Sequence, residues 1–242
     1  MKNMLIATDF SPAARDAARY TMRLAEVFGS SVSLVSVYST LPVTVSESLA
    51  VVTTFDKRKT IVERLAAEAS VLTPGAESVH TIAKEGPRVE SILAVAGQVG
   101  AELIVVGMKD EGRKTRRLFG STVTGLARKT TIPILVIPEG FGFSPPAAIA
   151  LSNDKTLDRN LQRVAVVRQI TGRFEPTVYV VRIFGHTVRR VCRGLMRFIE
   201  SHAIDLLVMT PHRRFGSASW FMRSHTRIML FRVHIPLLIL PA

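Results

Sequence analysis

The end of the chain repeats a stretch from its middle, and this repeat limits the possible folds more than any other feature. Shifting the sequence by 103 residues lays 102–139 on 205–242 without a gap. The identities fall on prolines and apolar positions, where topology is fixed, whereas chance identities would scatter. The matched pairs are Leu103/Leu206, Val105/Val208, Ser121/Ser224, Ile132-Pro133/Ile235-Pro236, Leu135/Leu238 and Pro138/Pro241. The sequence therefore indicates an internal duplication. The second copy is shorter, and we expect it to lack a counterpart of about residues 32–72.

The first copy alternates short apolar runs with amphipathic stretches, which is typical of βαβ units and a mainly parallel sheet. Ser11 followed by Pro12 predicts a helix start, and Gly29 predicts its end after Phe28. We expect strands at 4–8, 32–38, 79–84, 103–107 and 133–137. We expect the other helices at 56–72, 89–99 and 121–129. This half is therefore predicted to be α/β.

A Gly/Pro-rich stretch, EGFGFSPP at 139–146, predicts a linker, and the alternation restarts beyond it. Strands are expected at 147–151, 177–183, 206–209 and 236–240, with helices at 158–170 and 186–202. We therefore predict two α/β domains in tandem, 1–139 and 146–242, each a Rossmann-like open parallel sheet.

Charge separates the two halves. Residues 1–140 hold 17 Lys and Arg against 14 Asp and Glu, whereas residues 141–242 hold 15 against 5. The second half could therefore bind an acidic partner such as nucleic acid, a lipid surface or a protein, although a solvated basic face is the simpler explanation of the charge. No apolar run approaches the roughly 20 residues of a membrane span, and the N-terminal run stops at Asp9. We expect a cytoplasmic protein.

The residues suited to a ligand follow two strands of the first half. Asp9 follows the first strand, and a segment from Gly107 to Gly120-Ser121 follows the fourth. In an open parallel sheet these ends meet at the crevice where ligands bind. Gly107 is expected to let the backbone approach the ligand, while Gly120 and Ser121 offer a helix N-terminus to phosphates. No catalytic triad, zinc motif or positioned nucleophile is evident, so we assign no catalytic or metal-binding residue.

At these residues the sequence resembles the universal stress protein family, in its ATP-binding branch, as a tandem of two such domains. That branch has the motif Gly-x2-Gly-x9-Gly-Ser/Thr. Gly107 and Gly120-Ser121 keep its outer spacing, but Asp110 takes the middle position and the nearest glycine is Gly112. The opening ATDFSPAARDAARYTMRLAEVFGSSVSLVSVY and the turn EGPRVESI also resemble the family. Lys109, Lys114 or a divalent cation such as Mg²⁺ would be needed to offset Asp110 beside phosphates.

The resemblance implies a site for ATP or a related adenine nucleotide in the first domain. Ala7, Thr8 and Asp9 would contact the nucleoside, and the backbone at Val37 would read the adenine edge. Val106, Gly107 and the nearby Gly112 would line the ribose and phosphate approach, with Gly120, Ser121 and Thr122 on the phosphates. In the second copy the counterparts of Gly107 and Gly120 are Thr210 and Arg223, and the bulky residues Trp220 and Met222 stand in the loop, so that copy is expected to be degenerate.

The resemblance also implies how the two halves join. Residues 133–137 and 236–240, the last strands of the two copies, are apolar between their flanking prolines and would be exposed at sheet edges. We expect them to pair antiparallel, as an intramolecular pseudo-dimer. Three functions remain open: a regulatory or stress-response protein that binds nucleotide, an ATPase or adenylyl-transferring enzyme of the same architecture, and a nucleotide-free interaction module acting through the basic half.

Overall fold

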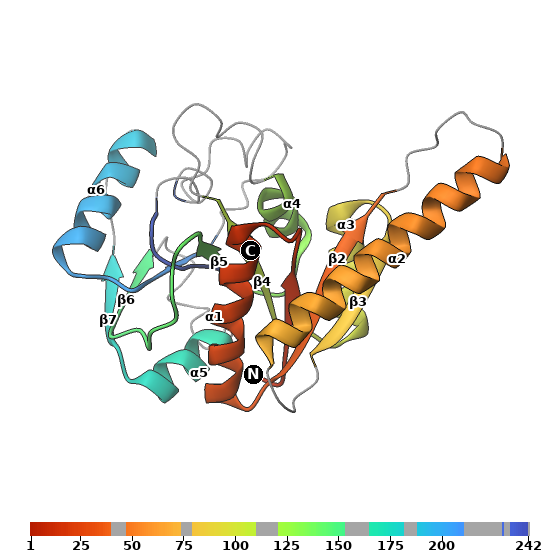
Figure 1. Ribbon diagram of the computed structural model, residues 1–242. Coiled ribbons are helices and arrows are strands. Elements are labelled where there is room, and N and C mark those ends of the chain that lie inside the picture. The colour runs from red at the N-terminus through yellow and green to blue at the C-terminus, as the bar shows by residue number, and fades with distance from the viewer. Residues whose placement is uncertain are drawn as a thin grey trace.

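The computed structural model describes residues 1–39, 47–73, 79–109, 121–152, 165–181, 188–210, 229 and 233–241. Side chains at 47–56, 121, 188 and 189 are not among them. The described strands form one nine-stranded sheet in the order β3-β2-β1-β4-β5-β9-β8-β6-β7. Helices cover both faces of this sheet, and α1, α2 and α5 lie on the near side in Figure 1. The predicted α/β class is confirmed.

Most elements lie where the sequence predicts them. The first half consists of β1 (Asn3–Ala7), α1 (Pro12–Phe28), β2 (Ser31–Tyr38), α2 (Glu47–Leu72), β3 (His80–Glu85), α3 (Arg88–Gln98), β4 (Leu103–Met108), α4 (Ser121–Lys129) and β5 (Ile134–Pro138). The second half consists of β6 (Ala148–Ser152), α5 (Ala165–Phe174), β7 (Thr177–Val181), α6 (Val188–Ser201), β8 (Leu206–Met209) and β9 (Leu237–Ile239). Helix α2 is the main difference, because it begins at Glu47 and not at Asp56. Residues 158–164 and 182–187 of the predicted second-half elements lie outside the described residues.

Helix α1 shows why the caps in the sequence are reliable. The Ser11 hydroxyl accepts a hydrogen bond from the backbone N–H of Ala14 at 3.2 Å, which satisfies one of the unpaired donors of the first turn. Gly29 ends the helix in the left-handed region, with φ of 61°. These two residues set where β1 and β2 lie relative to the helix between them.

The two halves meet through their last strands. Strand β5 pairs antiparallel with β9, with Leu135 opposite Leu238, whereas the other strand pairs in the sheet are parallel. The side chains of both strands are buried, so this junction belongs to the core. The expected antiparallel pairing of terminal strands is therefore present, within one continuous sheet. The domain boundaries 1–139 and 146–242 stay predictions.

The order of the strands in the sheet shows which elements of the first half have no counterpart in the second. Met4 pairs with Val32 on β2 and with Leu103 on β4. Ile149 of β6 pairs in the same way with Val178 on β7 and Leu206 on β8. Strand β7 is thus the counterpart of β2, and among the described residues nothing corresponds to α2 and β3. The expectation that 32–72 lacks a counterpart was therefore wrong for β2, whose counterpart is β7, and it missed β3, because chain order does not reveal which strand lies beside which.

An acid-to-backbone contact recurs at equivalent places in the two halves. The Glu102 carboxylate accepts a hydrogen bond from the backbone N–H of Lys2 at 3.2 Å. Its counterpart Asp205 accepts from Ala147 and Ala148 at 2.8 and 2.9 Å. Each acid precedes a central strand and holds the start of the neighbouring one. The repeated contact is what duplication of the sequence leads us to expect.

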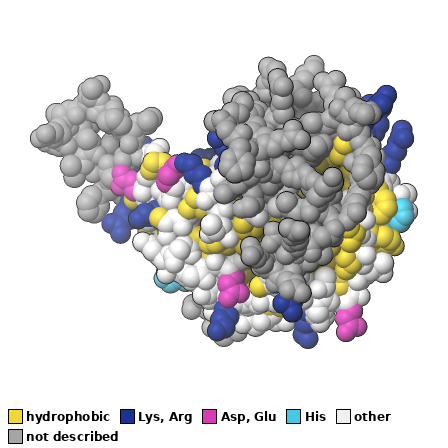
Figure 2. Space-filling model, turned by 180° about the vertical axis from the view of Figure 1, so that it is seen from behind, with side chains coloured by type: hydrophobic (Ala, Val, Ile, Leu, Met, Phe, Trp, Pro, Cys, Tyr) yellow, Lys and Arg dark blue, Asp and Glu magenta, His cyan; other side chains and the backbone are white. Residues whose placement is uncertain are grey.

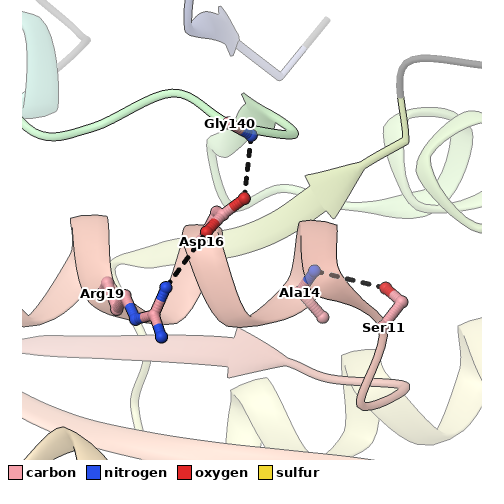
Figure 3. Close-up of polar contacts among 5 residues, drawn as sticks. All are labelled: Ser11, Ala14, Asp16, Arg19 and Gly140. Carbon is pink, nitrogen blue, oxygen red and sulfur yellow. Dashed lines mark hydrogen bonds and ion pairs between the residues drawn. The ribbon is translucent and has the colours of Figure 1, made fainter.

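The predicted linker is packed against the molecule. The backbone N–H of Gly140 donates to Asp16 on α1 at 2.8 Å, and Asp16 also pairs with Arg19 (Figure 3). Phe143 then meets Tyr20 edge-on, with ring centroids 5.1 Å apart, and lies 6.4 Å from Phe174 of α5. Burial, followed by the charge of Asp205, raises the pKa of Tyr20 well above its usual range. The linker therefore ties α1 to α5 through aromatic contacts.

Among the described helices, none is both long enough and apolar enough to cross a membrane.

Candidate nucleotide site

A pocket of about 100 Å³ opens at the carboxyl ends of β1, β2 and β4. In a doubly wound sheet this end of the strands is the usual place for a ligand. The pocket volume is below the roughly 300–1,000 Å³ of drug-sized sites. Residues 110–120, between β4 and α4, lie outside the described residues. Its described lining consists of Ala7, Thr8, Asp9, Ala14, Val35, Val37, Arg88, Ile92, Val106, Gly107, Thr122 and Val123.

Most of the residues predicted for the site lie together in this pocket. They are Ala7, Thr8, Asp9, Val37, Val106, Gly107 and Thr122. Ser121 is the first residue of α4, but its side chain is not described. Gly112 and Gly120 lie outside the described residues, as does Asp110. The structure thus brings the two predicted chain segments together, and their roles toward a ligand stay predictions.

The turn between β1 and α1 holds Asp9 at the rim of the pocket. Phe10 has φ of 64°, a left-handed conformation that a residue with a side chain rarely adopts. Its ring is buried beneath α2, and the guanidinium carbon of Arg64 lies 4.0 Å from the ring centroid. One carboxylate oxygen of Asp9 accepts a hydrogen bond from the backbone N–H of Ser11 at 3.0 Å. The turn is therefore fixed from both sides, with Asp9 exposed.

Thr8 contributes to the wall of the pocket, but its hydroxyl is engaged within the protein. This oxygen accepts from the backbone N–H of Phe10 at 3.0 Å and donates toward the carboxylate of Glu68, whose oxygens lie 3.3 Å away. Burial raises the pKa of Glu68, while the Thr8 hydrogen bond and the charges of Arg15 and Arg64 act in the opposite direction. Thr8 therefore connects β1 to α2, and its hydroxyl could donate to a ligand only if the bond to Glu68 broke.

Gly107 is required for packing, a reason that the sequence did not suggest. A Cβ added at Gly107 would lie 2.1 Å from the carbonyl oxygen of Ala13 and 2.6 Å from the backbone nitrogen of Ala14. Real side chains do not approach backbone so closely, and backbone cannot move aside as the tip of a side chain can. The glycine therefore lets the end of β4 lie against the first turn of α1. Close approach of a ligand is not needed to explain it.

Helices α3 and α4 form the opposite wall of the pocket and pack closely. A Cβ at Gly125 would lie 2.6 Å from a methyl group of Val89, so the glycine sets the spacing of the two helices. The Lys129 ammonium also forms an ion pair with Glu90. These contacts fix Arg88 at the start of α3 relative to Thr122 at the start of α4.

Sequence reasoning missed five residues of the described lining, and Arg88 is the charged one among them; the others are Ala14, Val35, Ile92 and Val123. Arg88 falls in the EGPRVESI segment, which we had used only as a turn between strand and helix. One signal was present, because Arg88 precedes Ile92 and Val95 at the spacing of a single helix face, and those two residues are buried. A charged residue at the end of a row of apolar residues on one helix face indicates where that face passes from the core to solvent.

The corresponding segment of the second half lies mostly outside the described residues. Thr210, the counterpart of Gly107, follows β8 and is half-buried. Trp220 and Met222, which we expect to fill the loop, lie outside the described residues, as does Arg223, the counterpart of Gly120. The degeneracy of the second copy therefore stays a prediction.

Residues 1–138 match the model of the universal stress protein family. The chain is 28% identical over 137 residues to the universal stress protein Sll1654 of Synechocystis sp., which covers 57% of this chain and 85% of that protein. It is 38% identical over 53 residues to the stress response protein NhaX of Bacillus subtilis, covering 22% of this chain and about a third (32%) of that protein.

Solved structures resemble the fold over the full length. A universal stress protein from Archaeoglobus fulgidus superposes with a TM-score of 0.74 at 15% identity, covering 99% of this chain and 98% of that one. A putative universal stress protein from Pseudomonas aeruginosa gives 0.62 at 14% identity, covering 100% and 93%. At such identities these structures support the fold only. Since the family model spans more than half of the sequence, this chain belongs to the universal stress protein family.

Proposed function

We propose that the first half binds ATP or a related adenine nucleotide, and that the protein has a regulatory or stress-response role. The observation that carries the proposal is the convergence in one pocket of residues from β1, β2, β4 and α4. Seven of the ten predicted site residues line that pocket. Their segments are far apart in sequence, and the parallel strands bring them to the crevice where ligands bind in sheets of this kind.

The lining suits a nucleoside in particular ways. Val35, Val37 and Val106 offer apolar walls on which a flat base can lie. Asp9 keeps one carboxylate oxygen that is not engaged within the described residues, and it can accept hydrogen bonds from ribose hydroxyls. Thr122, in the first turn of α4, stands where phosphates meet the positive end of a helix. Asp9 is the only carboxylate in the described lining, so Mg²⁺ would enter with the phosphates of the nucleotide.

The direct test is mass spectrometry of the small molecules released when the purified chain is heat-denatured, followed by calorimetric titration with ATP. We expect one site per chain. Asp9→Ala should weaken binding, whereas Glu26→Ala, which removes an exposed acid paired with Arg23 outside the pocket, should not. Two equivalent sites, or an Asp9→Ala variant with unchanged affinity, would contradict the proposal. Steady phosphate release would favour the alternative of an ATPase.

A second candidate function is a nucleotide-free interaction through the basic half. Arg190, Arg193 and Arg197 on α6 are exposed, and Figure 2 shows Lys and Arg side chains on the side of the molecule where α6 lies. Each phosphate neutralised by such a side chain releases counterions, so binding to a polyanion should fall steeply with salt. Titration with a short DNA duplex at rising salt tests this, with the Arg193→Ala/Arg197→Ala variant beside the wild type. If no binding is detectable at low salt, the basic face of α6 is exposed to solvent only and does not bind a polyanion.

A further inference from the structure

Arg88 occupies the pocket end of the buried face of α3. Arg88, Ile92 and Val95 follow one another at intervals of four and three residues, which places them on one face of the helix. Ile92 is 2% exposed and Val95 is fully buried, so this face is turned toward the sheet. Arg88 and Ile92 both line the pocket. Arg88 itself is exposed, so its side chain lies at the open edge of the pocket, where the buried face of α3 meets solvent.

The backbone that carries Arg88 is held from three directions. Gly86 precedes it with φ of 135°, and a Cβ at Gly86 would lie 2.7 Å from the Ser91 hydroxyl. Val89 packs against Gly125, and Glu90 pairs with Lys129 on α4. A side chain on so fixed a base loses less freedom on contacting a ligand than one on a loose segment.

The charges in the pocket leave Arg88 available. The charged side chains of the described lining are Asp9 and Arg88. Asp9 accepts from the backbone N–H of Ser11, and the Thr8 hydroxyl is engaged by Phe10 and Glu68. Arg88 makes no hydrogen bond or ion pair with the part of the chain that the structure describes. A pocket lined by a guanidinium that has no partner among the described residues favours an anionic ligand, because the planar fork matches two oxygens of a phosphate.

We propose that Arg88 is the specificity-determining residue that makes this pocket select phosphorylated nucleotides over nucleosides. The proposal rests on the proposed nucleotide site and adds to it the group that recognises a phosphate. Lysine at this position would supply the charge but not the two-pronged contact. The Arg88→Lys variant therefore separates geometry from charge.

The test is calorimetric titration of the full chain with ATP, AMP and adenosine, using wild type, Arg88→Ala and Arg88→Lys. Arg168→Ala is the matched control, because Arg168 is an exposed arginine on α5 outside the pocket. Removing a charge-assisted contact should weaken ATP and AMP by about tenfold or more. Adenosine should bind equally to wild type and Arg88→Ala, and Arg88→Lys should fall between the other two proteins. Circular dichroism confirms that each variant is folded.

The outcomes separate this inference from the proposed function. Equal weakening of all three ligands in Arg88→Ala would overturn the phosphate role and assign the guanidinium to the base or ribose. Unchanged affinities would overturn it as well, with the nucleotide site still standing. If wild type binds no nucleotide, titration with tripolyphosphate tests the anion site directly. Loss of tripolyphosphate binding in Arg88→Ala but not in Arg168→Ala would support an anion site. Equal tripolyphosphate binding by wild type and both variants would overturn both proposals.

Discussion

Val32 and Val178 hold equivalent places in the two halves of the sheet, yet Val32 is 8% exposed and Val178 is 40% exposed. The next residues on the same face repeat the contrast, since Leu34 is fully buried and Val180 is 52% exposed. Helix α2 packs on β2 and β3 and contributes Leu65 to the same core as Val32. Strand β7 ends the described sheet, and no described helix corresponds to α2 there. The shortened copy thus leaves one apolar strand face uncovered.

This contrast predicts different effects of the same substitution. Val32→Ala removes buried methyl groups and should lower the free energy of unfolding by about 2 kcal/mol. Val178→Ala, at the equivalent place, should cost less than about 1 kcal/mol, because most surface substitutions have small effects. Urea denaturation of the two variants measures the difference. Equal costs would mean that Val178 is covered in solution.

Gly107→Ala should destabilise the protein and should not act mainly through ligand binding. The added methyl group would have to displace the backbone of Ala13 at the start of α1, and such overpacking costs typically about 1–3 kcal/mol. Gly142→Ala is the control, since nothing lies within 4 Å of a Cβ there. Thermal unfolding without nucleotide separates the two roles. A Gly107→Ala chain with unchanged stability would restore the interpretation that the glycine serves the ligand.

Local signals in the sequence were enough to predict most single elements. Ser11, Pro12 and Gly29 determine the bounds of α1, because caps act within one turn. The start of α2 was missed, although Ser46 directly before Glu47 is a residue type that is favoured at helix N-caps. Spatial order was not predictable either: the place of β7 beside β6 depends on hydrogen bonding between strands, which leaves no local trace.

The candidate site was likewise predictable in its main residues but not in how its elements pack. The approach of Asp9 to Gly107 follows from the general rule that parallel strands end at one crevice. Two details needed the structure. The packing of Gly107 on Ala13 depends on how closely α1 crosses β4, and the position of Arg88 depends on the turn at Gly86. Both are distances between elements, which motif spacing does not give.

Glu68 should make the stability depend on pH. Because burial raises its pKa in the folded protein, the folded state holds a proton more tightly than the unfolded chain. The stabilising effect of that proton is present below the unfolded pKa and is lost as pH rises through the folded one. Glu68→Gln, which can still accept from Thr8, should therefore raise the melting temperature at pH 7, and the gain should vanish in acid. A variant less stable than wild type at pH 7 would show that the charges of Arg15 and Arg64 outweigh burial.

The last prediction concerns the strands that join the halves. Leu238 is fully buried and lies opposite Leu135 where β5 pairs with β9. A carboxylate there would lose its hydration without an opposite charge, since the flanking residues of both strands are apolar. Leu238→Asp should therefore destabilise both halves together, by about 3 kcal/mol or more. Leu238→Met, which nearly keeps the volume, should cost less than about 1.5 kcal/mol.

Two probes report whether the halves unfold together in this variant. Tyr20 lies in the first half and Tyr179 in the second. A chain with Tyr20→Phe and Tyr38→Phe keeps only Tyr179 and reports on the second half. A chain with Tyr38→Phe and Tyr179→Phe keeps only Tyr20 and reports on the first half. Trp220 is replaced by Phe in both so that tyrosine fluorescence can be followed. Coincident transitions, shifted equally by Leu238→Asp, are expected if β5 and β9 form one core. A transition that shifts in the second half only would show that the first half is stable without its partner strand.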